Sequence, residues 1–378
     1  MNKRILVFSD WFDPAYKAGG PVRSLLNLTS IWPFETSVLT SNEDLDDHGP
    51  MKSVESDQWL QKNQNVQVYY QSAPQRSVAF LKKTILSDCW SAYYINSLFS
   101  LWFSIIPLWI LKGKSLSHKV VLAPRGMLHE GAFSQKKNKK KVFVWLGKRI
   151  GLWKGILWHA TSEWEKQRIL KVIDENARVV VFPNIPSLIP RTQFPSWNAQ
   201  QQTWLVVSRI SPEKGIIETL DWIATSPHAH KVELIVIGPI ENQVYYQQCL
   251  RLLAQFPALK VQFKGDLPAE KIQPYRENCH LFFSSTKGEN YGHSIAESIL
   301  SGMPVIITNT TAWKDLEVLG IGWDVEWTKE GFQNAIERWW CLDEKQYLEM
   351  LNQIQLYRSR WKAQQMMELD WKKMFPFL

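Results

Sequence analysis

Runs of apolar residues, each followed by a stretch with helical spacing, recur along the first half of the chain. They lie at residues 4–10, 36–41, 91–97, 118–126, 156–162 and 178–184. Strands that are apolar throughout, rather than at every second position, are typical of a parallel sheet covered by helices on both faces. Their alternation with helices predicts an α/β fold, with a doubly wound parallel sheet, over residues 1–185.

A second series of strands follows a break in this pattern. Residues 186–202 are rich in Pro, Ser and Gln and show no period, so we expect a linker there. Beyond it, the runs TWLVVSRIS, KVELIVIGP, LKVQFKGD, CHLFFSST and MPVIITN again alternate with helical stretches. They predict a second parallel α/β domain over residues 203–360. Ligands bind outside the carboxyl ends of parallel strands, so two such sheets facing each other would form a cleft between the domains.

Length and composition agree with two globular domains. The chain has 378 residues, 45% of them hydrophobic, and 20 are Trp, which is ample for two cores. Its four cysteines lack the spacing of a disulfide framework or a zinc site, as expected in a reducing cytosol. The N-terminus runs directly into the first strand, so we expect no signal peptide and predict a cytoplasmic protein.

Positive charge is concentrated in one segment. The net charge is +8, and residues 112–154 hold twelve Lys or Arg against Glu130 alone. Trp145, Trp153 and Trp158 are interspersed with the basic residues. The segment is either a solvated charged face or a surface that docks on anionic lipid, because such lipids attract Lys and Arg, and Trp favours the interface. No nucleic-acid-binding signature accompanies it, so nucleic acid is not an expected partner.

The apolar stretch at residues 98–111 is too short to span a membrane. It has 14 residues and contains Pro107, whereas a spanning helix needs about 20 apolar residues. We expect a buried or an interfacial helix.

Two carboxylates mark residues 287–307, KGENYGHSIAESILSGMPVII. A helix is expected to begin near Gly292 and to end at Gly302, so that Glu289 lies in the loop after a strand and Glu297 inside the helix. The free amides at the helix start suit a phosphate. A nucleotide-sugar has the matching layout, with two hydroxylated rings joined by a diphosphate. The alternative for the pair of carboxylates is an ordinary solvated helix face.

Residues 208–215, SRISPEKG, place Arg209 and Lys214 in a loop after another apolar strand. A diphosphate leaving group needs positive charge where its own negative charge develops, and a guanidinium with an ammonium can provide it without a metal. The sequence DLD at residues 44–46 has the spacing of a metal site but no strand on both sides to fix it, so we expect no metal. A dehydrogenase is disfavoured because no GxGxxG follows the first strand.

Together these two segments resemble the signature segments of the family 4 glycosyltransferases. The resemblance extends to AGGPVRS, INSLFS, LAPRGML, WHATSEWE and VFPN in the first half, in the family's order. It implies the GT-B fold, with two Rossmann-like domains facing a cleft and a terminal helix, residues 361–378, that returns to the first domain. It also implies a retaining, metal-independent enzyme that uses a nucleotide-sugar. The segment at 286–316 most resembles bacterial members that build surface polysaccharides.

The resemblance implies a role for each matching residue. Glu289 would contact the donor sugar and help to position it in the transition state, Arg209 and Lys214 would hold the diphosphate, and Glu297 would bind the nucleotide ribose. Further substrate contacts would come from Asn290, Tyr291, Gly292, Gly19, Gly20 and Gly265.

One departure concerns the N-terminal domain. Several relatives carry a His near the reacting sugar, whereas this chain has Arg125 at the matching strand end, with His129 slightly later. We expect Arg125 to bind substrate, and which of the two residues reaches the donor stays open. His159, in WHATS, is expected to be a packed or a loop residue.

Three functions stay open. In the first, the enzyme moves a sugar from a UDP- or GDP-sugar to a glycan on a lipid carrier or lipopolysaccharide core, and the basic segment docks it on the inner face of the cytoplasmic membrane. In the second, the acceptor is soluble. In the third, the fold serves as a binding or scaffold subunit without turnover, which the intact Glu and Arg/Lys motifs disfavour.

Overall fold

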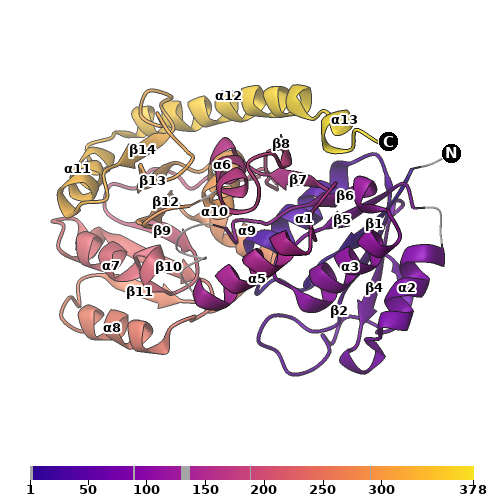
Figure 1. Ribbon diagram of the computed structural model, residues 1–378. Helices are drawn as coiled ribbons and strands as arrows, with labels where there is room; N and C mark the ends of the chain where they lie inside the picture. The colour runs from indigo at the N-terminus through magenta and orange to yellow at the C-terminus, as the bar shows by residue number, and fades with distance from the viewer. Residues whose placement is uncertain (1–2, 88–89, 129–136, 188, 290) are drawn as a thin grey trace. The chain divides into compact units, whose positions relative to one another are not determined.

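The structure is a computed structural model that describes residues 3–87, 90–128, 137–187, 189–289 and 291–378 (Figure 1). The chain divides into two compact units. The N-terminal unit consists of Met1–Ile185 together with Leu369–Leu378, and the C-terminal unit is Pro186–Glu368. Each unit contains one sheet, with eight strands in the first and six in the second. The predicted α/β class with two predominantly parallel sheets is confirmed.

The sheet of the N-terminal unit has the order β3-β4-β2-β1-β5-β6-β7-β8. Strand β3 pairs antiparallel with β4, and the other pairings are parallel. Burial explains why the strands are apolar throughout, since Ile5, Leu6, Val7 and Phe8 of the first strand are all 0% exposed. The strands are β1 (Arg4–Phe8), β2 (Glu35–Ser41), β3 (Trp59–Gln61), β4 (Val66–Gln71), β5 (Ala92–Ile95), β6 (Val120–Leu122), β7 (Leu157–Ala160) and β8 (Arg178–Val181).

Helices in the loops between these strands supply the covering layers. They are α1 (Gly20–Ile31), η1 (Ala73–Gln75), α2 (Val78–Ser87), η2 (Leu101–Ile105), α3 (Ile106–Gly113), η3 (Ser117–Lys119), α5 (Lys137–Arg149), α6 (Glu163–Val172) and α13 (Trp371–Met374). The stretch predicted as a buried or interfacial helix forms η2 and α3. Phe103, Leu108, Ile110 and Leu111 are buried, whereas Leu101 is 65% and Trp109 is 62% exposed. None of the helices in the described part of the chain combines the length and hydrophobicity that a membrane span requires.

The sheet of the C-terminal unit has the order β11-β10-β9-β12-β13-β14, with parallel pairings throughout. Its strands are β9 (Gln202–Val207), β10 (Val232–Ile237), β11 (Lys260–Phe263), β12 (Leu281–Ser284), β13 (Val305–Thr308) and β14 (Gly322–Val325). Its helices are η4 (Pro212–Lys214), α7 (Ile216–Ala224), η5 (Ala229–Lys231), α8 (Gln243–Leu253), α9 (Ala269–Asn278), α10 (His293–Ser301), α11 (Lys329–Trp340) and α12 (Glu344–Glu368). The predicted helix between Gly292 and Gly302 is confirmed as α10, with these two glycines as its caps.

Two segments at the ends of the units pack in specific ways. Before β9, the 5%-exposed Arg191 donates from Nη2 to the carbonyl oxygen of Cys279, at 3.1 Å, within the C-terminal unit. At the end of the chain, the rings of Trp371 and Phe375 pack against Phe34, with centroids 6.4 Å and 5.4 Å away. The last ten residues are thus part of the N-terminal unit. They include α13, which Figure 1 labels close to the C-terminus.

Candidate functional site

Lys214 and Glu289 form an ion pair at the edge of the C-terminal sheet. Lys214 ends η4, in the loop after β9, and Glu289 lies in the loop after β12, the strand that neighbours β9. The ammonium contacts Glu289 Oε1, and the two side chains are 14% and 23% exposed. The structure therefore brings together two of the residues predicted from the sequence, at the carboxyl ends of adjacent parallel strands.

Glycine at position 215 allows the two loops to meet. Gly215 has a φ of 64°, and a Cβ atom there would lie 2.2 Å from the carbonyl oxygen of Ser285. The Ser285 hydroxyl donates to the carbonyl of Gly215, at 2.6 Å, and the amide of Lys287 donates to the carbonyl of Glu213, at 3.0 Å. A side chain at 215 would force the loops apart, so this glycine sets the distance between Lys214 and Glu289.

The N-terminus of α10 follows directly after Glu289. Gly292, with a φ of 74°, is its N-cap and offers no side chain to the first amides of the helix. The carbonyl of the preceding Tyr291 accepts a hydrogen bond from Trp313 Nε1, at 2.7 Å. The Tyr291 hydroxyl is buried without a hydrogen-bond partner among the described residues, and burial raises the pKa of this phenol. Asn290, which was predicted to contribute backbone contacts, lies outside the described residues.

Glu297 is buried inside α10 rather than on a solvated helix face. Its carboxylate is 5% exposed, and Oε2 accepts a hydrogen bond from Nη2 of Arg276 on α9 at 2.6 Å. Arg276 is itself 6% exposed. The sequence analysis missed Arg276, because a partner on another helix leaves no local spacing signal.

Arg209 is not brought together with Glu289 in this structure. Its Nη1 contacts Oε1 of Glu241, in the loop after β10, at 2.6 Å, and the two side chains are 49% and 41% exposed. Gly265, after β11, has a φ of 70° and open space where a side chain would be. Its carbonyl accepts a hydrogen bond from the amide of Gly238, at 2.8 Å. The loops after three neighbouring strands thus carry a predicted residue or its partner: Arg209 after β9, Glu241 after β10 and Gly265 after β11.

In the N-terminal unit, the glycine-rich loop leads into α1. Gly19 is the N-cap, with a φ of 66°, and Gly20 is the first helical residue. Asp44 fixes the start of this loop, because its Oδ2 accepts hydrogen bonds from the amides of Tyr16, at 2.9 Å, and Lys17, at 3.2 Å. The first carboxylate of the DLD sequence therefore stabilises the loop that precedes α1. Residues 3–87, 90–128, 137–187, 189–289 and 291–378 contain no group of three His, Cys, Asp or Glu placed to hold a metal.

Arg125 lies at the carboxyl end of β6, where it donates to Asn96, Asn184 and Tyr94. The sequence analysis did not identify these neutral partners, although Asn96 and Asn184 each lie at the end of a run predicted to form a strand. His159 is 1% exposed, which agrees with a packed residue. His129, the alternative to Arg125, lies outside the described residues.

Comparison with known proteins assigns the C-terminal unit to a family. Residues 191–352 match the family described as glycosyl transferases group 1. The C-terminal unit therefore contains a group 1 glycosyltransferase domain. The predicted enzyme class is therefore confirmed. No curated protein sequence is significantly similar to this glycosyltransferase.

Solved structures that resemble the glycosyltransferase cover both units. HepE from Anabaena, in complex with UDP and glucose, is 18% identical, with 95% of each chain covered and a TM-score of 0.68. Sucrose-phosphate synthase from Thermosynechococcus elongatus is 16% identical, with 96% of this chain and 100% of that chain covered and a TM-score of 0.64. WaaG, a glycosyltransferase involved in lipopolysaccharide biosynthesis, is 13% identical, with 94% of this chain and 95% of that chain covered and a TM-score of 0.63. The predicted GT-B fold is confirmed.

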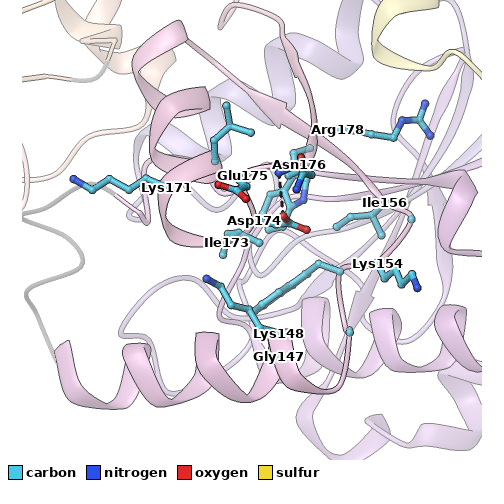
Figure 2. Close-up of a pocket in the computed structure, with 16 residues that line it drawn as sticks. Gly147, Lys148, Lys154, Ile156, Lys171, Ile173, Asp174, Glu175, Asn176 and Arg178 are labelled. Carbon is cyan, nitrogen blue, oxygen red and sulfur yellow. Dashed lines mark hydrogen bonds between the residues drawn. The ribbon is translucent and has the colours of Figure 1, made fainter.

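A cavity of about 810 Å³ lies elsewhere in the N-terminal unit of the glycosyltransferase (Figure 2). It is lined at the amino ends of β7 and β8, which is the sheet edge opposite to Arg125. Figure 2 shows basic side chains around it, from α5, α6, β8 and the loop before β7, together with two acidic ones. These residues are Lys148, Lys154, Lys171, Arg178, Asp174 and Glu175. The cavity is separate from every predicted substrate residue.

Proposed function

We propose that the chain transfers a sugar, with retention of anomeric configuration, from a nucleotide-sugar such as a UDP- or GDP-sugar to a growing glycan. The observation that carries this proposal is the Lys214–Glu289 pair beside the uncapped N-terminus of α10. An ammonium, a carboxylate and the N-terminal amides of a helix at one strand edge match the diphosphate and sugar hydroxyls of such a donor. The structural likeness to HepE, which was solved with UDP and glucose, supports the same class of donor.

In this proposal the donor diphosphate draws Lys214 away from Glu289. The bond between the sugar C1 and the diphosphate oxygen breaks, and the negative charge that develops on the diphosphate is stabilised by Lys214, Arg209 and the amides of α10. The acceptor hydroxyl attacks C1 from the face that the diphosphate leaves, and its proton passes to a leaving phosphate oxygen. Glu289, released from Lys214, accepts hydrogen bonds from the sugar hydroxyls and positions the ring.

The other predicted residues complete the donor site in the proposal. Glu297 reads the nucleotide ribose, and backbone groups at Asn290, Tyr291 and Gly292 contact sugar and phosphate. Gly265 serves the base, and Gly19 with Gly20 lets the N-terminal loop approach the donor without a side chain in between. No step of this proposal requires a metal.

A thermal-shift screen with UDP, GDP and their sugars tests the donor site. A ligand at about one hundred times its Kd adds about 2.7 kcal/mol to the free energy of unfolding, so one nucleotide is expected to raise the Tm of the wild type. Lys214→Ala should abolish this rise and lower kcat/KM about 10²–10³-fold in donor hydrolysis or transfer. Lys329→Ala is the matched control, because it removes a lysine from an exposed ion pair with Asp221 in the same unit. No response to any nucleotide at millimolar concentration would favour a scaffold protein.

The finer part of the proposal is a lipid-linked acceptor, with α5 as the surface that docks on the membrane. Four large apolar side chains on α5 and just after it are exposed: Val142 by 57%, Trp145 by 61%, Leu146 by 46% and Ile150 by 40%. Their spacing places them along one face of the helix. We call these four residues the exposed apolar stripe.

The opposite face of α5 already packs on the core of its unit. Val144 is 6% exposed, and the ring of Phe143 lies 5.6 Å from Phe99 and 5.8 Å from Trp153. A Cβ atom at Gly147 would lie 2.3 Å from the Trp153 ring, so glycine lets this helix approach closely. The exposed apolar stripe is thus a second apolar face, beyond what folding requires.

Exposed cations accompany the stripe. Lys139, Lys141, Lys148 and Arg149 are all exposed on α5. Each cation near an anionic surface adds about 1 kcal/mol of attraction, and Trp settles at the lipid interface. The likeness to WaaG, which acts in lipopolysaccharide biosynthesis, supports an acceptor of this class. We therefore expect peripheral binding to an anionic bilayer.

Vesicle flotation separates this proposal from a soluble acceptor. The wild type should bind vesicles that contain anionic lipid at low salt and should be released by high salt. Trp145→Ala and Leu146→Ala should reduce the bound fraction, whereas Leu348→Ala, at a 56%-exposed position of the C-terminal unit, should not. A wild type that stays unbound at low salt would leave a soluble acceptor as the function.

A further inference from the structure

Arg125 is a half-buried cation whose side-chain hydrogen-bond partners, among the described residues, are neutral. It donates from Nε to Asn96 Oδ1 at 2.7 Å, from Nη1 to Asn184 Oδ1 at 2.9 Å, and from Nη2 to the Tyr94 hydroxyl at 2.8 Å. Among the described residues no carboxylate forms an ion pair with it, and its remaining N–H groups have no partner. Arginine N–H groups are rigidly arranged, so these three bonds fix the plane in which the remaining donors lie.

A second layer fixes Tyr94. The Tyr94 hydroxyl lies 2.7 Å from His159 Nδ1, and His159 Nε2 lies 2.7 Å from the carbonyl oxygen of Phe182. A carbonyl can only accept, so Nε2 carries the proton, Nδ1 accepts from the hydroxyl, and the hydroxyl oxygen accepts from Arg125. Burial lowers the pKa of His159 to about 3, with Arg125 adding to the effect. His159 is therefore neutral, and the second layer holds Arg125 without compensating its charge.

The backbone at Arg125 is also unusual. Its φ is 52°, a left-handed conformation that few non-glycine residues adopt. The next residue, Gly126, has a φ of 75°, and its amide donates to Glu165 Oε1 at 2.6 Å. Strained backbone persists where the surroundings enforce it, and it concentrates at functional sites. With this backbone conformation, the Arg125 side chain reaches Asn96 and Asn184, at the ends of β5 and β8.

These strand ends meet the start of α1. Asn96 follows β5, Arg125 follows β6 and Asn184 follows β8, while Nδ2 of Asn96 donates to the carbonyl of Pro21, at 3.3 Å. Pro21 comes directly after the Gly19–Gly20 pair. Arg125 thus lies at the ligand-binding edge of the N-terminal sheet, next to the glycine-rich loop.

We propose that Arg125 binds an oxyanion of the acceptor, a phosphate or a carboxylate near the hydroxyl that receives the sugar, and that Tyr94 and His159 are its positioning residues. The inference rests on the proposed function and adds the class of acceptor to it. The cations proposed for the donor diphosphate, Lys214 and Arg209, belong to the other unit, and each already faces a carboxylate. Among the described residues, Arg125 forms no ion pair with a carboxylate, and a guanidinium fits the planar edge of a phosphate or carboxylate.

Methyl phosphate, acetate and UDP are the three probes, with thermal shift as the readout. Methyl phosphate is expected to raise the Tm of the wild type, of Lys214→Ala and of Arg178→Gln, which removes an exposed arginine of β8. Arg125→Gln should abolish this rise and keep the response to UDP, whereas Lys214→Ala should lose the response to UDP. A rise with acetate as well would support an oxyanion of either kind, and a rise with methyl phosphate alone would support a phosphate.

Two outcomes would overturn the proposal. The first is a response to methyl phosphate that survives in Arg125→Gln or is missing in the wild type. The second is an Arg125→Gln variant that also loses the response to UDP, because Arg125 would then serve the donor. Failure of the donor proposal looks different: no nucleotide shifts the wild type, while the response to methyl phosphate still depends on Arg125.

Tyr94→Phe tests the positioning role, because it keeps the ring and removes the hydroxyl. Loss of one hydrogen bond to a charged group should weaken methyl phosphate binding about tenfold, as measured from the concentration dependence of the Tm. Arg125→Lys, which keeps the charge but loses the fork, should be weakened as well. A Tyr94→Phe variant with a lower Tm and unchanged affinity for methyl phosphate would show a purely structural role and would overturn this part.

Discussion

The charged residues predicted for the donor site in the C-terminal unit each form an ion pair, whereas the side chain of Arg125 in the N-terminal unit hydrogen-bonds to neutral groups among the described residues. The pairs differ in exposure. Arg276–Glu297 is 6% and 5% exposed, Lys214–Glu289 is 14% and 23%, and Arg209–Glu241 is 49% and 41%. A buried pair is costly to separate and an exposed one is nearly free to exchange partners.

The exposure of an ion pair therefore indicates whether it holds the fold together or can break when a ligand binds. Arg276–Glu297 is expected to hold α9 and α10 together in every state of the enzyme. Lys214 and Arg209 can leave their carboxylates when a diphosphate offers more negative charge. In the proposal Arg125 needs no such exchange, because among the described residues it forms no ion pair that an anion would have to break.

Breaking the buried pair should have the largest effect. Arg276→Met leaves the Glu297 carboxylate buried without this partner, which should lower the free energy of unfolding by about 3–5 kcal/mol. Urea denaturation measures the change. Arg338→Met is the matched control, because it breaks an ion pair with Glu317 whose side chains are 50% and 55% exposed, and it should cost no more than about 1 kcal/mol. Similar losses of unfolding free energy in both variants would show that the burial of an ion pair does not decide how much it costs to break.

Two glycines with similar backbone angles test whether Gly215 sets the distance between Lys214 and Glu289. Gly265→Ala places a Cβ in open space at a φ of 70° and should cost about 1 kcal/mol of stability, from the left-handed conformation alone. Gly215→Ala, at a φ of 64°, adds a clash with Ser285 and should cost about 2–4 kcal/mol. Equilibrium unfolding compares the two variants. Equal losses would show that the contact between the two loops does not depend on Gly215.

The neutral layer under Arg125 predicts a pH dependence. The pKa of His159 is lowered to about 3 in the folded protein, against about 6.5 in the unfolded chain. Its contribution to stability is therefore complete above pH 6.5 and is lost as the pH falls towards 3, because the unfolded state takes up the proton first. Between pH 7 and pH 5 the wild type should lose about 2 kcal/mol more than His159→Gln.

Unfolding free energies at the two pH values give this difference directly. His230→Gln is the control, since His230 is exposed in the C-terminal unit and the variant should follow the wild type. A His159→Gln variant whose pH dependence equals that of the wild type would mean that folding does not lower the pKa of His159.

The sequence allowed the strand ends to be predicted, and through them the meeting of Lys214 with Glu289. Continuous apolar runs identified both strands, and parallel strands deliver their following loops to one edge. Three strands were missed. Strand β4, VQVYYQ, carries aromatic and β-branched residues that could have revealed it, whereas β3 has three residues and β14 begins at Gly322, a weak strand former.

The partners of the predicted residues could not be predicted. Glu241 follows a different strand from Arg209, Arg276 lies on a different helix from Glu297, and Asn184 is 59 residues from Arg125. Such contacts depend on how distant elements pack, which no local spacing encodes. For the same reason the sequence could not show which charged side chains form ion pairs.

The exposed pair should give the smallest effect. Glu241→Gln removes the carboxylate that holds Arg209, and it should change the free energy of unfolding by less than about 1 kcal/mol. If Arg209 exchanges Glu241 for the donor diphosphate, releasing it in advance should tighten UDP binding, about twofold to fivefold for an exposed pair of this strength. Titration calorimetry with UDP measures the Kd, and Glu317→Gln at the similarly exposed Arg338 pair is the control. An unchanged Kd in Glu241→Gln would mean that Arg209 stays with its surface partner, and Lys214 would then be the only one of the two cations that the diphosphate recruits.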